Sequence, residues 1–396
     1  MFSISTVVEK VIFLKLEGQF MNRKIRMGMV GGGPGSFIGA AHRRAANLDG
    51  KIELVAGCFS RDPAKGAVTG AELFIDPERV YTDYKTMFAA EAKRADKIDL
   101  VSIVTPNAAH FEVAMAALDA GFDVICDKPM TTTVEQAKLL AEKVHSTGRL
   151  FALTHNYTAY PMVRQARQMV KDGVLGDIRK IVVEYPQGWL ADAVTDDNKQ
   201  GKWRTDPALA GISCCMGDIG SHAENLAEFI TGLQITELCA DLASFVPGRT
   251  LDDDGSVLLK FNNGARGILF ASQIAVGEEN ALRIRIYGTK NALEWVQEDP
   301  ETLVMRSNTG DRQVMRRNWA GAGAAWSRLP AGHPEGFFEA FANLYTDMAN
   351  AIAARADGVE YVTSYPTVDD GVRGVAFIEA VVKSSKTENK WMKFEV

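Results

Sequence analysis

The sequence lacks the features that are typical of exported proteins and of proteins that bind membranes or nucleic acids. It has no long run of basic residues, and its formal net charge is −6 over 396 residues, so we expect neither a nucleic-acid nor a membrane partner. Charged residues interrupt the short apolar run within the first twenty residues, so we expect no signal peptide there. No internal repeat or low-complexity segment is present.

Cysteine is also scarce. The five cysteines are an odd number without the spacing of a disulfide framework, which predicts a reduced, cytoplasmic protein. Cys214 and Cys215, with Asp218 and His222 downstream, suggest a zinc site at first sight. Neighbouring cysteines rarely chelate one tetrahedral ion, however, and no second cysteine pair exists. We therefore expect no metal.

What is present is enough apolar sequence for more than one domain. Hydrophobic residues make up 46% of the chain, and 396 residues predict about two to three domains. Residues 1–23 are expected to be an extension before the first domain. Met21 stands just before the first apolar strand and is expected to be the functional start, so residues 1–20 should be dispensable. The change of pattern after residue 156 predicts domains over residues 24–156 and 157–396.

The first of these domains alternates apolar, strand-like runs with helical patterns, which is typical of βαβ units in a doubly wound parallel sheet. The expected strands are 25–30, 52–58, 98–104, 122–126 and 150–154, and the expected helices are 39–48, 63–70, 108–120 and 134–146. Ligands of such sheets bind beyond the carboxyl ends of the strands. The candidate site loops are therefore Gly31–Ser36, Thr105–Asn107 and Asp127–Pro129.

The second domain has a different order of predicted helices and strands. A helix at 161–171 and a strand at 178–185 precede a long polar stretch, 186–207, which we interpret as a substrate loop. Strand-like runs then follow one another from 237 to 316 without helices between them, and helical patterns return at 335–354 and 371–385. The sequence therefore predicts an α/β domain followed by an α+β domain with a large, open, mostly antiparallel sheet covered by helices.

The stretch from Met27 to His42 runs from an apolar strand into a glycine-rich turn. Glycines let the backbone turn tightly and approach a diphosphate, and the N-terminus of the next helix attracts negative charge, so the turn predicts a dinucleotide site. In the usual spacing a third glycine follows Gly33 by three residues, where Ser36 stands instead, and Gly39 comes three residues late. A glycine-rich turn that binds nothing is the alternative.

Lys128 closes a buried strand and precedes a proline. Burial disfavours the charged form of a lysine, which suits it to hydrogen-bond or exchange a proton with a substrate hydroxyl. The alternative is a solvated lysine that merely follows a strand.

Asp218 and His222 lie four residues apart, a spacing that places two side chains on one face of a helix. A carboxylate beside an imidazole holds the ring and stabilises its protonated form, which is what the removal of a proton from an alcohol needs. The alternative is a capping aspartate and an unrelated histidine.

Four further residues are candidate substrate contacts, because an aromatic ring can lie against a sugar face and an arginine can bind its hydroxyls. They are Asn156, Tyr157, Trp203 and Arg204. A core tyrosine and a surface arginine are the simpler interpretations.

Taken together, these stretches resemble the glucose–fructose oxidoreductase, inositol dehydrogenase and MocA (Gfo/Idh/MocA) family, from Ile25 to the C-terminus. The resemblance is carried by motifs that occur in the family's order. They are the glycine turn, Val104-Thr-Pro-Asn107-x-x-His110, Cys126-Asp-Lys128-Pro129, Gly217-Asp218-Ile-Gly-Ser-His222 and Tyr365-Pro-Thr-Val-Asp-Asp370-Gly-Val-Arg.

The resemblance implies an N-terminal Rossmann domain, a C-terminal open-sheet domain and a nicotinamide cofactor between them. It implies that Lys128, Asp218 and His222 are catalytic, with His222 as the base and Lys128 orienting the substrate or relaying the proton. The cofactor residues that it implies are Gly31, Gly33, Pro34, Gly35, Ser36, Phe37, Ile38, Ser60, Arg61, Thr105, Pro106, Asn107, His110, Asp127 and Lys128. The substrate residues are Asn156, Tyr157, Trp203, Arg204, Asp218 and His222.

The chain departs from the family pattern in its glycine spacing and at two further places. Asp127 replaces the usual glutamate before Lys128, and the acidic residue expected after the second strand is missing, with Ser60 and Arg61 there instead. An acid at that position would hold the ribose 2′-hydroxyl of NAD, whereas a Ser-Arg pair suits a 2′-phosphate. The cofactor is thus expected to be NAD or NADP, with NADP favoured.

The hypothesis from the sequence is an NAD(P)-dependent dehydrogenase that reversibly oxidises a secondary alcohol of a sugar, sugar derivative or cyclitol to a ketone. One alternative is an NAD-dependent glycosidase of the same family that uses a transient oxidation. Another is a non-catalytic dinucleotide or sugar sensor. The family resemblance also implies a homodimer or homotetramer, paired through the open sheet.

Overall fold

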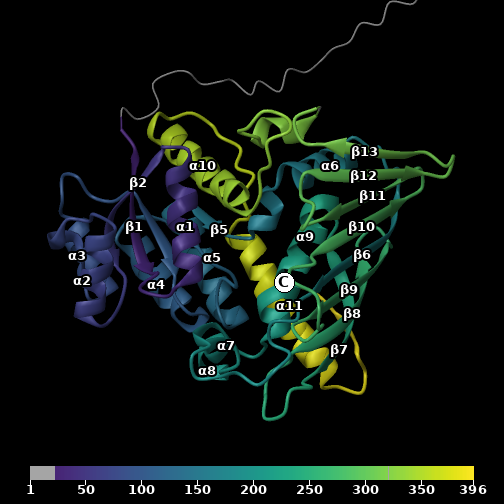
Figure 1. Ribbon diagram of the computed structural model, residues 1–396, viewed down its shortest axis with the longest axis horizontal. Helices are drawn as coiled ribbons and strands as arrows, with labels where there is room; N and C mark the ends of the chain where they lie inside the picture. The colour runs from purple at the N-terminus through teal and green to yellow at the C-terminus, as the bar shows by residue number, and fades with distance from the viewer. Residues whose placement is uncertain (1–22, 320) are drawn as a thin grey trace, which may run out of the picture.

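The computed structural model describes residues 23–319 and 321–396, so the expected N-terminal extension lies outside the described residues except for Arg23. Two β-sheets stand side by side with helices between them and over the first sheet (Figure 1). The first sheet is built from the N-terminal part of the chain and the second from the middle part.

The first sheet has five parallel strands in the order β2-β1-β3-β4-β5. Their bounds are β1 Ile25–Gly31, β2 Ile52–Cys58, β3 Leu100–Val104, β4 Asp123–Cys126 and β5 Phe151–Leu153. Every residue of β3, β4 and β5 is buried, which explains why these strands read as continuous apolar runs. The doubly wound parallel sheet is confirmed.

Four of the five helices of this part begin where the sequence provides a side-chain cap, and the fourth along the chain is the exception. They are α1 Phe37–Leu48, α2 Pro63–Glu72, α3 Tyr84–Glu91, α4 His110–Asp119 and α5 Val134–Thr147. Ser36, Asp62, Asp83 and Thr133 each accept a backbone N–H in the first turn of the helix that follows. The sequence did not indicate α3, which is only two turns long. Its signal is the Asp83 cap rather than apolar periodicity.

The second sheet has nine strands in the order β13-β12-β11-β10-β6-β9-β8-β7-β14. Their bounds are β6 Ile178–Pro186, β7 Ile235–Ala243, β8 Asp254–Phe261, β9 Arg266–Ser272, β10 Arg283–Gly288, β11 Asn291–Val296, β12 Thr302–Ser307, β13 Arg312–Arg316 and β14 Trp391–Lys393. Neighbouring strands are antiparallel except β6 and β9, which are parallel. The predicted mostly antiparallel sheet is confirmed, while β14 at its edge was not expected.

Helices α6 (Pro161–Lys171), α9 (Ser221–Thr231) and α11 (Val368–Ser385) lie on the side of the second sheet that faces the first sheet (Figure 1). Alternate residues of the strands point toward them, and Val183, Leu259 and Leu269 are fully buried there. The other face is not covered by any helix of the described residues.

The polar stretch 186–207 is not an irregular loop throughout, contrary to the expectation. It contains α7 (Lys199–Arg204), and α8 (Pro207–Ala210) follows directly. Asn198 and Asp206 cap these two short helices, and Pro207 starts the second. A π-helical turn, Met216–Gly220, then leads into α9.

The C-terminal helices bind the two parts of the molecule together. Helix α10 (Phe337–Ala356) returns to the first sheet and packs against α1, where Phe341 and Tyr345 contact the ring of His42. Helix α11 lies between α5 of the first part and β7 of the second. Because of this packing, the carboxyl ends of β1, β3 and β4 face α9 and the π-helical turn across a cleft.

Four 3₁₀ turns complete the fold, at Pro77–Arg79, Asn107–Ala109, Asn156–Ala159 and Ala322–Trp326. Among the described residues, no helix is long and apolar enough to cross a membrane.

Candidate active site

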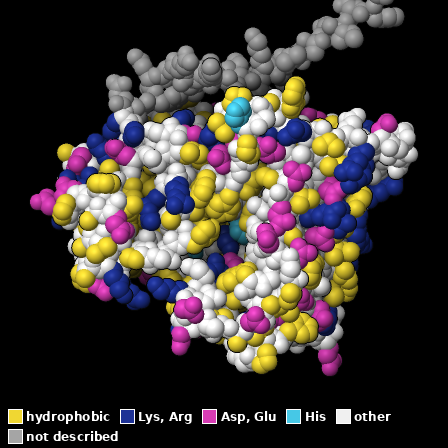
Figure 2. Space-filling view, in the orientation of Figure 1, with side chains coloured by type: hydrophobic (Ala, Val, Ile, Leu, Met, Phe, Trp, Pro, Cys, Tyr) yellow, Lys and Arg dark blue, Asp and Glu magenta, His cyan; other side chains and the backbone are white. Residues whose placement is uncertain are grey.

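The cleft between the two sheets has a volume of about 1160 Å³. Figure 2 shows the molecule hollowed there, with basic and histidine side chains visible inside. Its walls come from the glycine loop, the ends of β3 and β4, helix α7, the π-helical turn and the ends of β6, β10 and β11. Segments far apart in the sequence thus meet at one site.

The glycine loop has the close backbone packing that a diphosphate cradle requires. A Cβ atom on Gly39 would lie 2.4 Å from the Cα of Gly32, so only a glycine lets α1 approach the loop this closely. Gly39 therefore allows the close packing of helix and loop that the third glycine allows in the usual spacing, although the loop here is three residues longer. Ser36 caps the helix through a 3.2 Å hydrogen bond from the Gly39 N–H. The other N–H groups of the first turn have no partner within the helix and can meet an anion.

All but two of the predicted cofactor residues line the cleft. Those that do are Gly31, Gly33, Pro34, Gly35, Ser36, Phe37, Ile38, Ser60, Thr105, Pro106, Asn107, Asp127 and Lys128. They come from the carboxyl ends of β1, β2, β3 and β4, the edge at which parallel sheets bind ligands. The loop packing and this lining fit a dinucleotide.

His110 and Arg61 are the two exceptions. The buried ring of His110 has its Nδ1 2.8 Å from the carbonyl oxygen of Pro129 and its Nε2 2.9 Å from that of Thr105, so it supports the two strand-end loops from behind. Arg61 is exposed and lies outside the lining. Lys65, at the start of α2, lines the cleft together with Ser60 instead.

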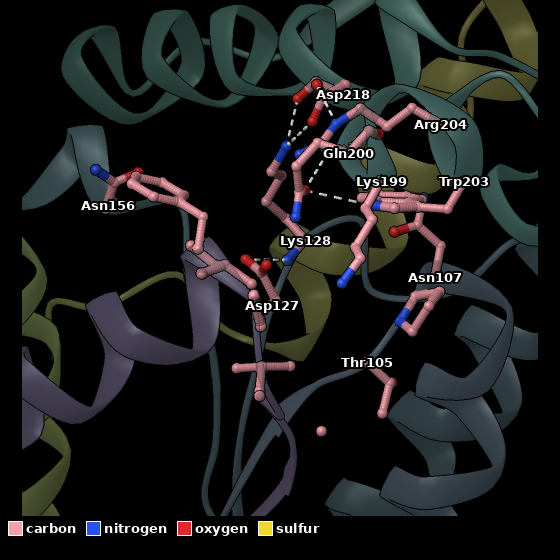
Figure 3. A pocket seen from close by; sticks show the side chains of 18 of the residues that line it. Thr105, Asn107, Asp127, Lys128, Asn156, Lys199, Gln200, Trp203, Arg204 and Asp218 are labelled. Atoms are coloured by element: carbon pink, nitrogen blue, oxygen red, sulfur yellow. Dashed lines mark hydrogen bonds and ion pairs between the residues drawn. The ribbon is translucent and has the colours of Figure 1, made fainter. Parts of the chain in front are cut away.

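Lys128 and Asp218 form an ion pair inside the cleft (Figure 3). The Lys128 ammonium donates to the Asp218 carboxylate oxygen Oδ1 at 2.7 Å and to the Asp218 carbonyl oxygen at 2.6 Å. Lys128 is thus an anchored cation rather than a solvated one. An ammonium has three N–H donors, so one remains for a ligand in the cleft.

The second carboxylate oxygen of Asp218 is also fully used. Arg204 Nε and Gln273 Nε2 each donate to it at 2.9 Å. Burial opposes ionisation of this carboxyl, but the charges of Arg204 and Lys128 outweigh burial and hold its pKa well below the usual range. Asp218 is therefore a carboxylate at neutral pH. No motif in the sequence indicated Gln273, which is buried and directly follows β9.

Asp218 does not contact His222, contrary to the interpretation of their spacing. The Asp218 side chain, in the π-helical turn, is held by Lys128, Arg204 and Gln273, whereas His222 lies in the first turn of α9. His222 lies instead beside His155, with their Nδ1 atoms 3.3 Å apart, and the Tyr157 ring packs edge-on against it at 4.8 Å.

Both of these histidines are neutral at physiological pH. Burial and the nearby charge of Lys128 lower the pKa of His155 to about 3. The same two causes, burial first, together with His155, lower the pKa of His222 well below its usual value. A neutral imidazole has one free lone pair, so His222 can accept a proton.

All of the predicted substrate residues line the cleft, but several are engaged within the protein. The Tyr157 hydroxyl bonds to that of Tyr185, and Asn280 Nδ2 donates to it at 3.2 Å. Trp203 packs under the Arg204 guanidinium, 4.3 Å from it. Asn156 differs, because its buried Nδ2 has no hydrogen-bond partner among the described residues.

Sequence reasoning missed a group of polar residues on the far wall of the cleft. They are Tyr185, Gln187, Asn280 and Gln297 at strand ends of the second sheet and Lys199 and Gln200 of α7. No motif marks them. Tyr185, Gln187, Asn280 and Gln297 stand at or next to the ends of apolar strands. Gln187, Lys199 and Gln200 belong to the stretch 186–207, the expected substrate loop.

The chain matches two family descriptions over adjoining segments. Residues 25–155 match the oxidoreductase family with an NAD-binding Rossmann fold, and residues 163–294 match the Gfo/Idh/MocA C-terminal domain. The chain belongs to the Gfo/Idh/MocA family of oxidoreductases. The resemblance seen in its motifs is thereby confirmed, and this Gfo/Idh/MocA member is an enzyme with an NAD-binding domain.

Relatives match this Gfo/Idh/MocA enzyme over nearly the whole length of both chains. An uncharacterised oxidoreductase of Bacillus subtilis, YfiI, is 37% identical over 96% of this chain and 100% of its own length. The structure of an inositol dehydrogenase homologue from Azotobacter vinelandii with NAD⁺ has a TM-score of 0.90 and 38% identity, covering 94% of this chain and 98% of its own. The structure of an A. vinelandii inositol dehydrogenase homologue with NADH and myo-inositol has a TM-score of 0.88 and 36% identity. The match covers 95% of this chain and 99% of the other.

The cysteines of this Gfo/Idh/MocA enzyme do not form a metal site. Cys214 donates its thiol proton to the Gln273 side chain at 3.2 Å, and Cys215 is buried beside it. Over residues 23–319 and 321–396, no three His, Cys, Asp or Glu side chains are grouped so that they could hold a metal ion.

Proposed function

We propose that this enzyme oxidises a secondary alcohol of a sugar, sugar derivative or cyclitol to a ketone, reversibly, with NAD or NADP. The observation that carries the proposal is the placement of Lys128, Asp218 and neutral His222 in the same cleft as the glycine loop. The A. vinelandii structure that contains NADH and myo-inositol, a cyclitol, supports this substrate class.

His222 serves as the general base for the hydroxyl proton. A bound nicotinamide would supply the acceptor for the hydride of the carbinol carbon. Because His222 is neutral and buried, its lone pair is available at pH 7, and removal of the proton leaves the substrate oxygen negatively charged.

Lys128 stabilises that developing charge. Two of its three N–H groups are held by Asp218, so the ammonium has a fixed position and its third N–H can donate to the substrate oxygen. A donor that is already oriented needs no rearrangement as charge develops, which is the source of its catalytic effect. Asp218 is in this view a positioning residue for Lys128 rather than for His222.

The glycine loop and the first turn of α1 would hold the cofactor diphosphate. Ser60 and Lys65 lie beyond β2, where the adenosine ribose of a Rossmann cofactor is bound. No carboxylate from this strand end lines the cleft. Lys65 lines it in place of Arg61 and brings a positive charge, 3.7 Å from the Asp62 carboxylate outside the lining. This lining supports a preference for NADP.

The far wall is suited to hydroxyl groups. Asn156 offers a free amide donor. Gln187 and Gln297 also line the cleft, and each uses one N–H of its amide within the protein, so a second N–H remains. Asn280, between them, has its amide fully used. Amides can both donate and accept, as a polyhydroxylated ring requires.

A titration with each cofactor, followed by a panel of sugars and cyclitols, tests the proposal. We expect reduced nicotinamide absorbance to rise with at least one neutral polyol. Binding without turnover across the panel, or release of free sugar from a glycoside without net NADH, would contradict the dehydrogenase.

We also propose that two or four copies associate through the open face of the second sheet. Leu258, Ile268 and Val314 point away from the helices and are 48%, 37% and 53% exposed. Exposed apolar residues on an uncovered sheet are typical of an interface. The molar mass from light scattering should be that of a dimer or tetramer. Leu258→Glu should lower this molar mass toward that of the monomer. The cytoplasmic location stays a prediction.

A further inference from the structure

We propose that Lys199 binds the cofactor diphosphate from the opposite side of the cleft, so that the diphosphate joins the Rossmann domain to the bridging segment, residues 186–210. The proposal rests on the proposed function, because it assumes a nicotinamide dinucleotide in the cleft. It assigns a ligand to a side chain that no sequence motif marks.

Lys199 reaches the glycine loop from a distant part of the chain. Its Nζ is 3.4 Å from the position that a Cβ atom on Gly35 would take, and both residues line the cleft. Figure 3 shows the Lys199 side chain pointing into the pocket, apart from the ion pairs around Asp218. The ammonium therefore stands beside the loop whose N–H groups would bind a diphosphate.

The ammonium of Lys199 has no carboxylate partner among the described residues. Other cations nearby are paired, Lys128 with Asp218 at 2.7 Å, Arg204 with Asp218 at 2.9 Å and Lys202 with Asp196 at 2.6 Å. Lys199 lies instead near the N-terminus of α1, the positive end of a helix dipole. Two positive charges face each other there, an arrangement that an anion between them would stabilise.

The bridging segment holds Lys199 in place from both sides. Asn107 Nδ2 donates to the Ala210 carbonyl oxygen at 3.1 Å, and Arg249 donates to the carbonyl oxygens of Leu190 and Asp192 at 3.0 and 3.1 Å. The ammonium is thus presented by an anchored helix, which reduces the entropy lost when it binds a ligand.

The same helix links the diphosphate to the catalytic cluster. Lys199 and Arg204 are the two ends of α7, and Arg204 donates to the Asp218 carboxylate that anchors Lys128. A contact between Lys199 and the diphosphate would therefore also fix the residue that positions Lys128.

A phosphate on the substrate offers the same chemistry as the diphosphate, so the experiment must separate the two. The dissociation constants of NAD⁺, NADP⁺, ADP-ribose, adenosine and glucose 6-phosphate are measured by calorimetry for wild type, Lys199→Gln and Lys199→Arg. Lys202→Gln is the matched control, because it removes one charge from the same helix on the solvent side.

We expect Lys199→Gln to weaken the binding of NAD⁺ and ADP-ribose about tenfold, because one charge-assisted hydrogen bond is lost. The affinity for adenosine, which has no phosphate, should be unchanged. Lys199→Arg should restore most of the loss, and Lys202→Gln should bind as wild type does. Unchanged NAD⁺ affinity in Lys199→Gln, or weakening of glucose 6-phosphate alone, would overturn the inference while leaving the proposed function intact. A wild-type protein that binds neither NAD⁺ nor NADP would overturn both.

Discussion

The Nδ1 atoms of His155 and His222 lie 3.3 Å apart in a buried cluster. Since both rings are neutral, only one of the two atoms carries a proton, and the other accepts it. If His222 donates, its Nε2 keeps the lone pair that a base needs. If His155 donates, Nε2 of His222 is protonated and cannot act as the base. The role of His222 as the base therefore requires the tautomer in which His222 Nδ1–H donates to His155.

Replacing His155 should therefore lower turnover without touching the cofactor. In His155→Leu the acceptor for the His222 Nδ1–H is lost, so we expect kcat to fall by about 10–100-fold, as when a base loses its orienting partner. In His155→Asn the amide oxygen can accept the same hydrogen bond and should restore part of the rate. Steady-state kinetics and NAD⁺ affinity check this, and wild-type kcat in His155→Leu would refute the role.

Lys128 and His222 should be needed for turnover but not for cofactor binding. Lys128→Met and His222→Gln should each reduce kcat by about 10²–10⁴-fold, because general-base and charge-stabilising effects are of this size. Calorimetry with NAD⁺ should give affinities close to that of wild type. Near-normal turnover in either variant would remove the role assigned to that residue.

Gly39→Ala should disturb the diphosphate cradle. Its Cβ would lie 2.4 Å from the Cα of Gly32, so the loop must shift, and we expect at least about tenfold weaker NAD⁺ binding together with a lower Tm. Gly66→Ala is a suitable control, because its Cβ would meet only the Ser60 carbonyl oxygen, at 3.7 Å. The control should bind as wild type does and gain up to about 1 kcal/mol of helix stability. Equal affinities in the two variants would contradict the role of Gly39.

Lys65→Glu should change the cofactor preference. The charge reversal places a carboxylate beside Ser60, where it repels a 2′-phosphate and can accept from a ribose hydroxyl. The affinity for NADP⁺ should fall by about tenfold or more, and that for NAD⁺ should stay the same or rise. Arg61→Glu is the matched control, since Arg61 is exposed outside the lining and should have the smaller effect.

Stability should fall on acidification before the carboxylates titrate. Burial lowers the pKa of His42 to about 4, and His155 and His222 are lowered as well. Below pH about 6.5 the unfolded chain binds protons at these rings that the folded protein does not, so the unfolding free energy drops by up to about 1.4 kcal/mol per ring per pH unit. This loss continues down to the folded pKa of each ring.

Urea unfolding at about pH 8, 6 and 5 measures this slope. His42→Gln keeps a polar group near Tyr345 but removes one titrating ring, so the slope should become smaller by up to a third. An unfolding free energy that is constant between about pH 8 and 5 would show that the buried rings are not neutral.

Much of this molecule was predictable because the relevant signals are local. Buried parallel strands are continuous apolar runs, capped helices begin at Ser or Asp, and a glycine turn after the first strand marks a phosphate-binding loop. The fold class, the glycine loop and the position of Lys128 at a strand end follow from such patterns alone.

The partners of these residues depended on tertiary structure, because they come from segments far apart in the chain. The spacing of Asp218 and His222 indicated a pair, yet a π-helical turn separates them and turns Asp218 toward Lys128 and His222 toward His155. Nor could spacing show that His110 would be buried behind the cleft. Local sequence determined which residues reach the cleft from each strand, but only the packing of the two sheets decided which charges meet, since ion pairing depends on distance in space.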